Sequence, residues 1–302
     1  MKFGVTVVPS VSDWHLFVEL EKMGYDCAWA ADSQMLYSDA YAVLALAAAN
    51  TSRIRLGTGV AVAPTRLAPV TAHSIASINR LASGRVFLGI GTGHTAMRVM
   101  GMPPMGFGAF REYVRVVRAL LRGDEVDYTH DGVTRTIRFL HLDRGFIAID
   151  PPIPIYLAAN APRMLALTGE VADGHVAMGN ERPRVLARHL TAIRGGAAKA
   201  GRTLPDGFHT TALTSAVVLR PGEAVDSDRV VARADRRSRP ACTSPTKHGR
   251  RRATTRPSRA RTRRCGRSTS TTWRPCGRRR TSAISRSTRA TAPTSSPPSA
   301  AS

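Results

Sequence analysis

Polar residues that could take part in acid–base chemistry or bind an anion follow several short apolar segments of the chain. They are Asp32, Ser33, Thr65, Arg66, Thr92, His94 and Asn160. An aspartate or a histidine in such a position can exchange a proton with a bound molecule that lies within hydrogen-bond distance. Asp32 and His94 are therefore the side chains of this set whose acid–base role has to be weighed, and we assign no metal ligands.

Two segments that contain glycine would let a ligand approach the backbone closely. The segment 56–64 (LGTGVAVAP) carries Gly57 and Gly59, and glycine within a strand often marks a bulge or the approach of a ligand. The segment 88–94 (LGIGTGH) ends in a glycine-rich turn, whose N–H groups can bind a ring or a phosphate. Its third glycine is misplaced for a dinucleotide-binding fingerprint.

The segment 158–162 (AANAP) joins an apolar run to a predicted helix. Helix N-termini at the C-terminal face of an α/β barrel commonly bind phosphate, so Ala159, Asn160 and Ala161 are candidates for phosphate contacts. Asp173 lies in an Ala-Asp-Gly turn before the next predicted strand. We expect this turn at the opposite face and assign it no chemistry.

Each of these motifs also has a structural interpretation. Asp32 could cap the helix that follows it. The glycines of 56–64 could mark a bend of the barrel, and His94 could be an ordinary turn residue. The segment 158–162 could be a simple connection between a strand and a helix. The sequence alone leaves these alternatives open.

Short β-like runs alternate with helical patterns along the first three quarters of the chain. Strands are predicted at 3–8, 25–31, 54–62, 86–90, 153–158, 174–178 and 208–219, and helices at 16–23, 40–49, 69–81, 110–121, 163–172 and 182–200. This alternation predicts a parallel sheet, and seven steps in one direction favour an incomplete (β/α)8 TIM barrel over an open Rossmann sheet. The segment 123–150 is expected to form a hairpin. Catalytic residues of a barrel lie at the C-terminal ends of its strands, where the polar residues above are found.

The positive charge of the chain is concentrated in its last quarter. The formal net charge is +23. Residues 1–232 contain 24 Lys and Arg against 20 Asp and Glu, whereas residues 233–302 contain 20 against 1. Of these last 70 residues, 51 are Arg, Lys, Ser, Thr or Pro, and only Trp273 and Ile284 are large and apolar. Such a segment buries too little surface to offset its ordering entropy. We therefore predict one folded domain over 1–232 and a disordered tail over 233–302.

We interpret this tail as the product of a shifted reading frame, which would leave the barrel without strand eight and its helix. Arg, Ser, Thr, Pro and Ala are what a GC-rich gene yields out of frame, and Lys247 is the only lysine of the tail. The alternative is a genuine basic tail that binds nucleic acid non-specifically through counterion release, although Trp273 is its only aromatic residue. A chain without function as written is a third possibility.

Cysteine usage and the N-terminus bear on the compartment. Of the four cysteines, Cys27 alone lies in residues 1–232, so no disulfide framework is implied. The N-terminus lacks the long apolar segment of a signal peptide, and the most apolar stretch, 40–49, is too short to cross a bilayer. We expect a cytoplasmic protein that does not associate with membranes.

Five motifs occur in an order that resembles the luciferase-like oxidoreductase family, in particular its coenzyme F420-dependent branch. They are G-Y-D-x-x-W-x-x-D, R-I-x-L-G-T-G-V, R-x-x-L-G-I-G-T-G, P-I-Y-L-A-A-N-A-P and E-V-A-D-G, beginning at Gly24, Arg53, Arg85, Pro154 and Glu170. The resemblance covers residues 1 to about 230. It implies a (β/α)8 barrel that usually forms a homodimer.

The resemblance also implies where a cofactor would lie. The residues near its ring would be Asp32, Thr58, Gly59, Val60, Thr92 and His94, and those near its phosphate would be Ala159, Asn160 and Ala161. Family members often have a bulged third strand against the ring, here around Val60 and Ala61. Many F420-dependent members carry Asp-His after the second strand. This chain has Asp32-Ser33, so no role of that histidine is carried over.

The implied reaction is hydride transfer between C5 of the deazaflavin F420 and a small organic substrate, with Asp32 or His94 moving the accompanying proton. The alternative on the same fold is an FMN-dependent monooxygenase, whose reduced flavin reacts with O₂. The motifs do not indicate the substrate. Four apolar residues, Met100, Met102, Met105 and Phe107, lie in the segment where specificity would reside, and they form either a lid or a packed insertion.

Overall fold

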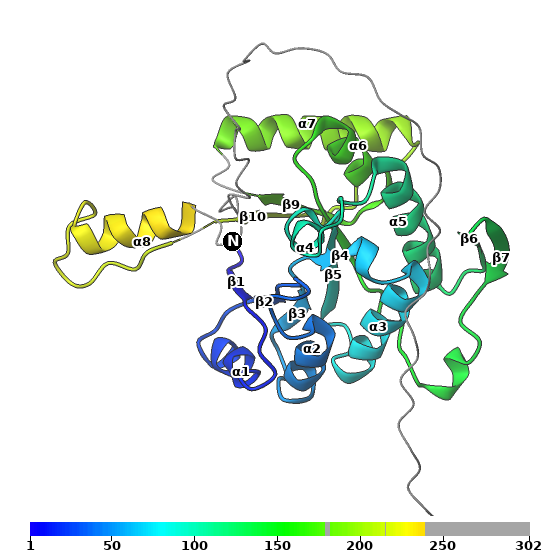
Figure 1. The fold of residues 1–302 in the computed structure, drawn as a ribbon, viewed down its shortest axis with the longest axis horizontal. Coiled ribbons are helices and arrows are strands. Elements are labelled where there is room, and N and C mark those ends of the chain that lie inside the picture. Colours follow the sequence, from blue (N-terminus) through cyan, green and yellow to red (C-terminus); the bar gives the residue numbers. More distant parts are fainter. Residues whose placement is uncertain (179–181, 215, 239–302) are drawn as a thin grey trace, which may run out of the picture. The chain divides into compact units, whose positions relative to one another are not determined.

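The computed structural model describes residues 1–178, 182–214 and 216–238, drawn in colour in Figure 1. They belong to the first compact unit of the chain, Met1–Thr246. The second unit, Lys247–Ser302, lies outside the described residues. The predicted disorder, nucleic-acid binding and shifted frame of the tail concern residues that are described only as far as Ser238.

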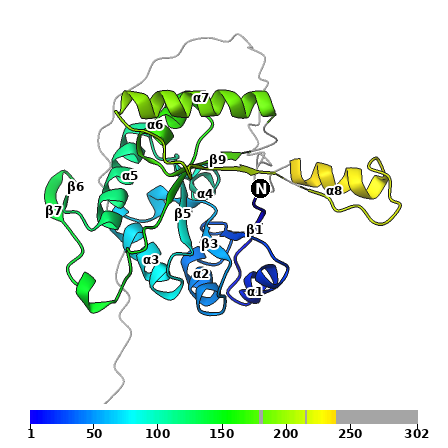
Figure 2. The same ribbon diagram turned by 180° about the vertical axis from the view of Figure 1, so that it is seen from behind.

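One parallel sheet organises the described residues. Its strands are β1 (Gly4–Val7), β2 (Cys27–Ala30), β3 (Arg55–Thr58), β4 (Ala61–Val62), β5 (Val86–Gly91), β8 (Ile155–Ala158), β9 (Gly174–Met178) and β10 (His209–Leu213). The order is β1-β2-β3-β5-β8-β9-β10, and β4 pairs with β5 beside this path. Within the described part of the chain, β1 and β10 each pair with one neighbour. The sheet is therefore a curled half-barrel, which confirms the predicted fold class (Figures 1 and 2).

Helices follow most of the strands. They are α1 (His15–Lys22), α2 (Ala40–Ala49), α3 (Ala68–Leu81), α4 (His94–Val99), α5 (Phe107–Arg122), α6 (Pro162–Val171), α7 (Pro183–Lys199) and α8 (Asp228–Ser238). The main core lies between the outer face of the sheet and helices α1, α2, α3, α5 and α6, with Phe17, Leu44, Ile75 and Phe110 fully buried there. The apolar runs of the sequence thus become strands covered on this face, as expected for a parallel sheet.

The inner face of the sheet carries a separate group of ring side chains. Trp29 of β2, Phe87 of β5 and Tyr156 of β8 are buried together, with ring centroids 4.4 Å apart for Trp29–Phe87 and 5.4 Å apart for Phe87–Tyr156. The ring of His209 on β10 stacks on Tyr156 at 4.6 Å. Arg55 of β3 donates a hydrogen bond to Tyr156 Oη at 3.0 Å. These contacts fill the concave side of the sheet below the strand ends.

The expected hairpin is confirmed. Strands β6 (Val126–His130) and β7 (Val133–Ile137) are antiparallel and form a sheet of their own. Asp131 and Gly132 connect them, with φ of 49° and 76°. Two consecutive residues with positive φ form the tight hairpin turn that Asp-Gly favours.

The structure differs from the predicted strands and helices at several points up to Leu213. The predicted strand 54–62 is divided into β3 and β4, and the peptide bond between Gly59 and Val60 is cis. Helix α4 was not predicted. The predicted strand 208–219 is observed as His209–Leu213, and each of these residues pairs with one residue of β9, from Gly174 to Met178.

Helix α8 spans the boundary that the sequence indicated at residue 232. It runs from Asp228 to Ser238, so the start of the predicted tail is helical. Asp228 lies in its first turn, where a negative charge is favourable to the helix dipole. The division of the chain at 232 remains a prediction.

Candidate functional site

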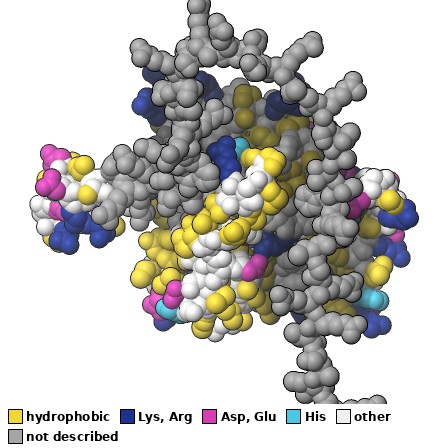
Figure 3. Space-filling view, in the orientation of Figure 1, with side chains coloured by type: hydrophobic (Ala, Val, Ile, Leu, Met, Phe, Trp, Pro, Cys, Tyr) yellow, Lys and Arg dark blue, Asp and Glu magenta, His cyan; other side chains and the backbone are white. Residues whose placement is uncertain are grey.

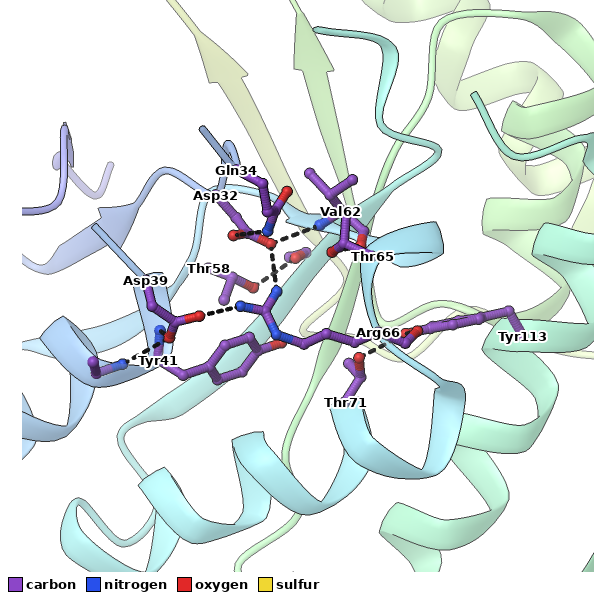
Figure 4. A network of polar contacts seen from close by, with 12 residues as sticks. Asp32, Gln34, Asp39, Tyr41, Thr58, Val62, Thr65, Arg66, Thr71 and Tyr113 are labelled. Carbon is purple, nitrogen blue, oxygen red and sulfur yellow. Dashed lines mark hydrogen bonds and ion pairs between the residues drawn. The ribbon is translucent and has the colours of Figure 1, made fainter. Parts of the chain in front are cut away.

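Asp32 follows β2, and its carboxylate is buried at the C-terminal edge of the sheet (Figure 4). Its Oδ2 accepts hydrogen bonds from the backbone N–H of Val62 and from Arg66 Nη1, both at 3.0 Å. Its Oδ1 accepts a hydrogen bond from Gln34 Nε2 at 2.7 Å. Donors from the loop after β2, from β4 and from the segment after β4 therefore hold the carboxylate at the C-terminal ends of the strands.

The environment of Asp32 affects its charge in opposite directions. Burial raises the pKa of its carboxyl, and the Val62 N–H and the Arg66 guanidinium partly offset this effect. The net shift of the pKa is upward. The donors stabilise the ionised form, as hydrogen bonds to a carboxylate do. Asp32 is thus a carboxyl group whose protonation depends on its neighbours.

Arg66 joins Asp32 to a second carboxylate. Its Nη2 lies against Asp39, and its guanidinium lies over the ring of Tyr41, with Cζ 4.6 Å from the ring centroid. Asp39 is the N-cap of α2 and accepts hydrogen bonds from the backbone N–H groups of Tyr41 and Ala42 at 2.9 and 3.0 Å. The helix-cap interpretation of Asp32 is therefore wrong, because Asp39 fills that position.

Two buried hydroxyl groups hold the backbone of Arg66. Tyr113 Oη donates to the Arg66 carbonyl oxygen at 3.0 Å, and it lies 2.6 Å from Thr71 Oγ1. Burial raises the pKa of Tyr113 to about 12. Because Thr71 belongs to α3 and Tyr113 to α5, two helices fix the segment that carries Arg66.

Thr58, Gly59 and Val60 lie where β3 gives way to β4. Thr58 is fully buried, and its Oγ1 donates to the Gly89 carbonyl oxygen at 2.6 Å. A Cβ on Gly59 would lie 2.7 Å from Trp29 Cβ, so this position requires glycine. Val60 is partly buried against the rings of the inner face. The three residues form a closely packed backbone segment beside Asp32.

Thr92 and His94 follow β5, as predicted, but they differ in exposure. Thr92 is half-buried, and its carbonyl oxygen accepts a hydrogen bond from the Met105 N–H at 3.0 Å. His94 is exposed at the start of α4, outside the network that holds Asp32. Gly93 between them has φ of 82°, and a Cβ there would lie 2.5 Å from Val62 Cγ1. The turn therefore requires glycine.

The methionine segment after β5 is largely a packed insertion. Met100 packs on the small cluster of Val62 and Met97. Met105 and Phe107 pack against the main core. Met102 is 45% exposed. The segment therefore supports the strand edge near Asp32, and Met102 is the member that faces outward.

The loop after β8 is fixed at its first residue. The Ala159 carbonyl oxygen lies 2.7 Å from Nε2 of the buried His175, and the Ala159 N–H donates to the Val176 carbonyl oxygen at 3.3 Å. Asn160 and Ala161 are exposed, and Ala161 is the N-cap of α6. The first N–H groups of a helix have no partner within the helix, but Pro162 at the start of α6 has no N–H and the Ala159 N–H is already engaged, so amide donors at this helix start come from the residues around these two.

The predicted site residues thus follow β2, β3, β5 and β8, at the C-terminal ends of the strands of the parallel sheet. Asp32 and Thr58 are buried within it, Asn160 and Ala161 are exposed, and His94 lies apart from the Asp32 network. Large apolar side chains are exposed in the loops after β1, β2 and β4, namely Val8, Val11, Met35, Leu36, Tyr37 and Leu67. Figure 3 shows hydrophobic side chains gathered on one face of the described part.

Three residues of the network have no role in the sequence-based assignment. Arg66 stood out as a polar residue after a strand, but nothing in the sequence pairs it with Asp32. Asp39 carries a local signal, because it directly precedes the apolar helix 40–49 and aspartate is a preferred N-cap. Gln34 carries none. Among the described residues, its Oε1 is buried without a hydrogen-bond partner.

Comparison with known proteins places this chain in a family. The sequence model of the luciferase-like monooxygenase family matches residues 14–282. The chain therefore belongs to this family. The match extends into the segment for which we predict a shifted frame, and that interpretation remains a prediction.

Relatives with established names share a substantial part of the sequence. The 5,10-methylenetetrahydromethanopterin reductase of Methanolobus tindarius is 37% identical over 67% of this chain and 61% of that protein. The same reductase of Archaeoglobus fulgidus is 35% identical over 77% of this chain and 67% of that protein. The F420-dependent glucose-6-phosphate dehydrogenase of Beutenbergia cavernae is 35% identical over 62% of this chain and 58% of that protein. This chain thus spans between 58% and 67% of the length of these relatives.

Solved structures share the fold. The coenzyme F420-dependent tetrahydromethanopterin reductase of Methanopyrus kandleri is 28% identical, with a TM-score of 0.58 over 70% of this chain and 65% of that one. A monooxygenase from Pseudomonas putida in complex with FMN is 20% identical, with a TM-score of 0.55 over 69% and 65%. In the described part of the chain, the helices are too short or too polar to span a membrane.

Proposed function

We propose that this chain is an oxidoreductase that transfers a hydride between coenzyme F420 and a small organic substrate. The relatives and the described residues both support this proposal. The relatives named above include enzymes described as F420-dependent. The described residues also place groups that could bind such a cofactor at the C-terminal ends of the strands. These groups are a buried carboxylate, a packed backbone segment and a helix N-terminus.

The residues present fit a deazaflavin ring. The observation that carries the proposal is the buried Gln34 Oε1 beside Asp32, an acceptor that finds no donor among the described residues. A buried polar atom normally has a partner, and a ring N–H would supply one. The ring would lie against Thr58, Gly59 and Val60, with Thr92 at its border.

The loop after β8 fits the phosphate of the cofactor. Negative groups are favourable at a helix N-terminus, because its amide donors and the helix dipole both attract them. The phosphate would lie at Ala159, Asn160 and Ala161, before α6. When bound, the cofactor would supply the hydride chemistry, and the protein would supply position and electrostatics.

The two candidate catalytic residues would have different roles. Asp32 is held by three donors, so we assign it to orienting the ring and to accepting a hydrogen bond. His94 is exposed and outside this network, which leaves it able to exchange a proton with substrate and solvent. The substrate class remains the small organic molecule predicted from the sequence.

A binding comparison tests the proposal. The purified full chain is titrated separately with oxidised F420 and with FMN while the fluorescence of each cofactor is followed. We expect saturable F420 binding that is at least about tenfold tighter than FMN binding, a difference of about 1.4 kcal/mol. Tighter FMN binding, together with rapid O₂ consumption by the reduced complex, would favour the FMN-dependent monooxygenase instead.

A further inference from the structure

We propose that Arg66 is a positioning residue of this site, which acts by holding the Asp32 carboxylate ionised and in place against Gln34. This inference rests on the proposed function in one respect, namely that the cofactor binds beside Asp32 at the C-terminal ends of the strands. The role of Arg66 itself follows from the contacts among the described residues. No motif of the sequence assigns it.

Arg66 occupies a position that another cation would fill poorly. The side chain of Arg66 is 16% exposed, and its guanidinium contacts Asp32 through Nη1 and Asp39 through Nη2. Two carboxylates from different segments therefore share one planar group. A guanidinium presents several donors in a fixed fork, whereas an ammonium is a compact point charge. A lysine at this position would reach one carboxylate at a time.

Arg66 is fixed from three sides. Tyr113 of α5 donates to its carbonyl oxygen, the ring of Tyr41 lies below its guanidinium, and Asp39 ties it to the start of α2. The cation is therefore held while the rim of the site around it is exposed. Such fixation is what a residue needs if it is to set the orientation of another.

Arg66 has a direct effect on the ionisation of Asp32. The groups that face Asp32 are Arg66 and Asp39, with the phenols of Tyr41 and Tyr113 beyond them. Arg66 is the one cation of this set. Without it, Asp32 would keep the Val62 N–H and the Gln34 amide, but burial and the negative charge of Asp39 would both favour its protonation.

The ionisation of Asp32 also sets the orientation of Gln34. An ionised carboxylate only accepts hydrogen bonds, so it binds the Nε2 of the amide and leaves Oε1 as the acceptor offered to a ligand. A protonated Asp32 could donate to the amide oxygen and consume that acceptor. Arg66 therefore acts on the ligand through Asp32 and Gln34, without touching the ligand itself.

The test compares Arg66→Met and Arg66→Lys with Arg115→Met, a matched control. Arg115 is an exposed arginine of α5 that pairs with Glu112, away from the Asp32 network. F420 affinity is measured between about pH 5 and pH 9 for each variant. We call the loss of F420 affinity at low pH the acid limb. We expect Arg66→Met to move this acid limb to a higher pH, by about one unit or more, because the loss of a neighbouring opposite charge usually has an effect of this size. Arg115→Met should leave the limb unchanged.

A double-variant cycle separates this role from a general structural one. In an Asp32→Asn background the acid limb should be absent, and Arg66→Met should then add no further pH dependence. An unchanged limb in folded Arg66→Met, or the same shift in the Asp32→Asn background, would overturn the proposal. If Arg66→Met does not fold, the decision rests on Arg66→Lys. We expect the acid limb of Arg66→Lys to move to a higher pH by a smaller amount, and an unchanged acid limb would contradict the proposal.

A measurement without cofactor distinguishes the two proposals. If the wild-type chain does not bind F420 at any pH, the proposed function fails. The role of Arg66 is then read from the pH dependence of urea unfolding of the apo chains. Arg66→Met, but not Asp32→Asn/Arg66→Met, should gain stability relative to wild type as the pH falls, because its Asp32 takes up a proton at higher pH. Parallel pH curves for the three chains would contradict the role of Arg66.

Discussion

The imidazole of His175 on β9 holds the carbonyl oxygen of Ala159, at 2.7 Å, in the loop that leads to the N-terminus of α6. His175 is fully buried, and the ring of His189 on α7 lies against it with 5.4 Å between centroids. The strand next to the predicted phosphate loop therefore sets the position of that loop. This relationship leads to a prediction about cofactor binding.

Replacing His175 should weaken the binding of the phosphate and leave the binding of the ring unaffected. His175→Leu removes the donor to a buried carbonyl, at a cost of about 1–3 kcal/mol in stability, and frees the loop. We expect weaker binding of F420 but unchanged binding of a deazaflavin with the same ring and no phosphate. His175→Gln, which retains an N–H donor, is the control. Equal loss for both ligands would argue against a phosphate site at this loop.

The hydrogen bond of Thr58 to Gly89 should contribute to stability. Thr58→Val keeps the shape of the side chain but removes a buried donor, which should lower the free energy of unfolding by about 1–3 kcal/mol. Thr58→Ser keeps the hydroxyl group and should therefore retain most of the contribution of this hydrogen bond to the free energy of unfolding. Urea unfolding measures the difference, with Thr134→Val on the exposed strand β7 as a control expected near zero. A Thr58→Val chain as stable as Thr58→Ser would show that the bond is not needed.

The stability of the described domain should fall in mild acid because of His209. Burial, followed by the charges of Arg55 and Lys2, lowers the pKa of His209 below its ordinary value. The folded state then binds fewer protons than the unfolded state below about pH 6.5. The free energy of unfolding should therefore decrease as the pH falls through that range.

The variant His209→Phe isolates this effect, because phenylalanine can keep the stack on Tyr156 without titrating. Unfolding free energies measured between about pH 5 and pH 8 should diverge below pH 6.5, with the variant losing less stability in acid. His130→Phe on β6, whose side chain is 54% exposed, is the control. Parallel curves for wild type and His209→Phe would show that His209 is not responsible.

The interpretation of residues 233–302 leads to a prediction at the level of the gene. Translating the DNA around codons 225–245 in all three frames should show a neighbouring frame that continues as an ordinary strand and helix. A chain expressed from that frame should unfold more cooperatively, because an added strand would cover an open edge of the sheet. A gene with no coherent neighbouring frame would support a genuine basic tail instead.

The sequence was sufficient to predict the strands and which residues lie at their ends. The strands predicted up to residue 178 are all observed, with 54–62 divided into two, because a parallel sheet covered by helices requires such apolar runs. Asp32, Thr92 and Asn160 follow their strands as expected. The hairpin expected within 123–150 is observed, and its Asp131-Gly132 turn is a local signal that the sequence analysis did not use.

The contacts that give these residues their properties could not be predicted in the same way. Arg66 meets Asp32 and Asp39 only because the loops after β2 and β4 are brought together by the folded sheet. Helix α4 is too short to give a periodic signal. The division between β3 and β4 likewise depends on packing against neighbouring strands. The pairing of Arg66 with two carboxylates is a tertiary feature that appears in no local pattern, whereas the glycines of 56–64 did indicate a bulge near the division of the strand.

The measurement that tests the central claim most directly is a crystal structure of this chain with oxidised F420. The account predicts the deazaflavin ring against Thr58–Val60, with a donor of the ligand on Gln34 Oε1 and the phosphate at Asn160 and Ala161. A ring bound elsewhere, or a phosphate away from the N-terminus of α6, would contradict the site that the strand edge defines.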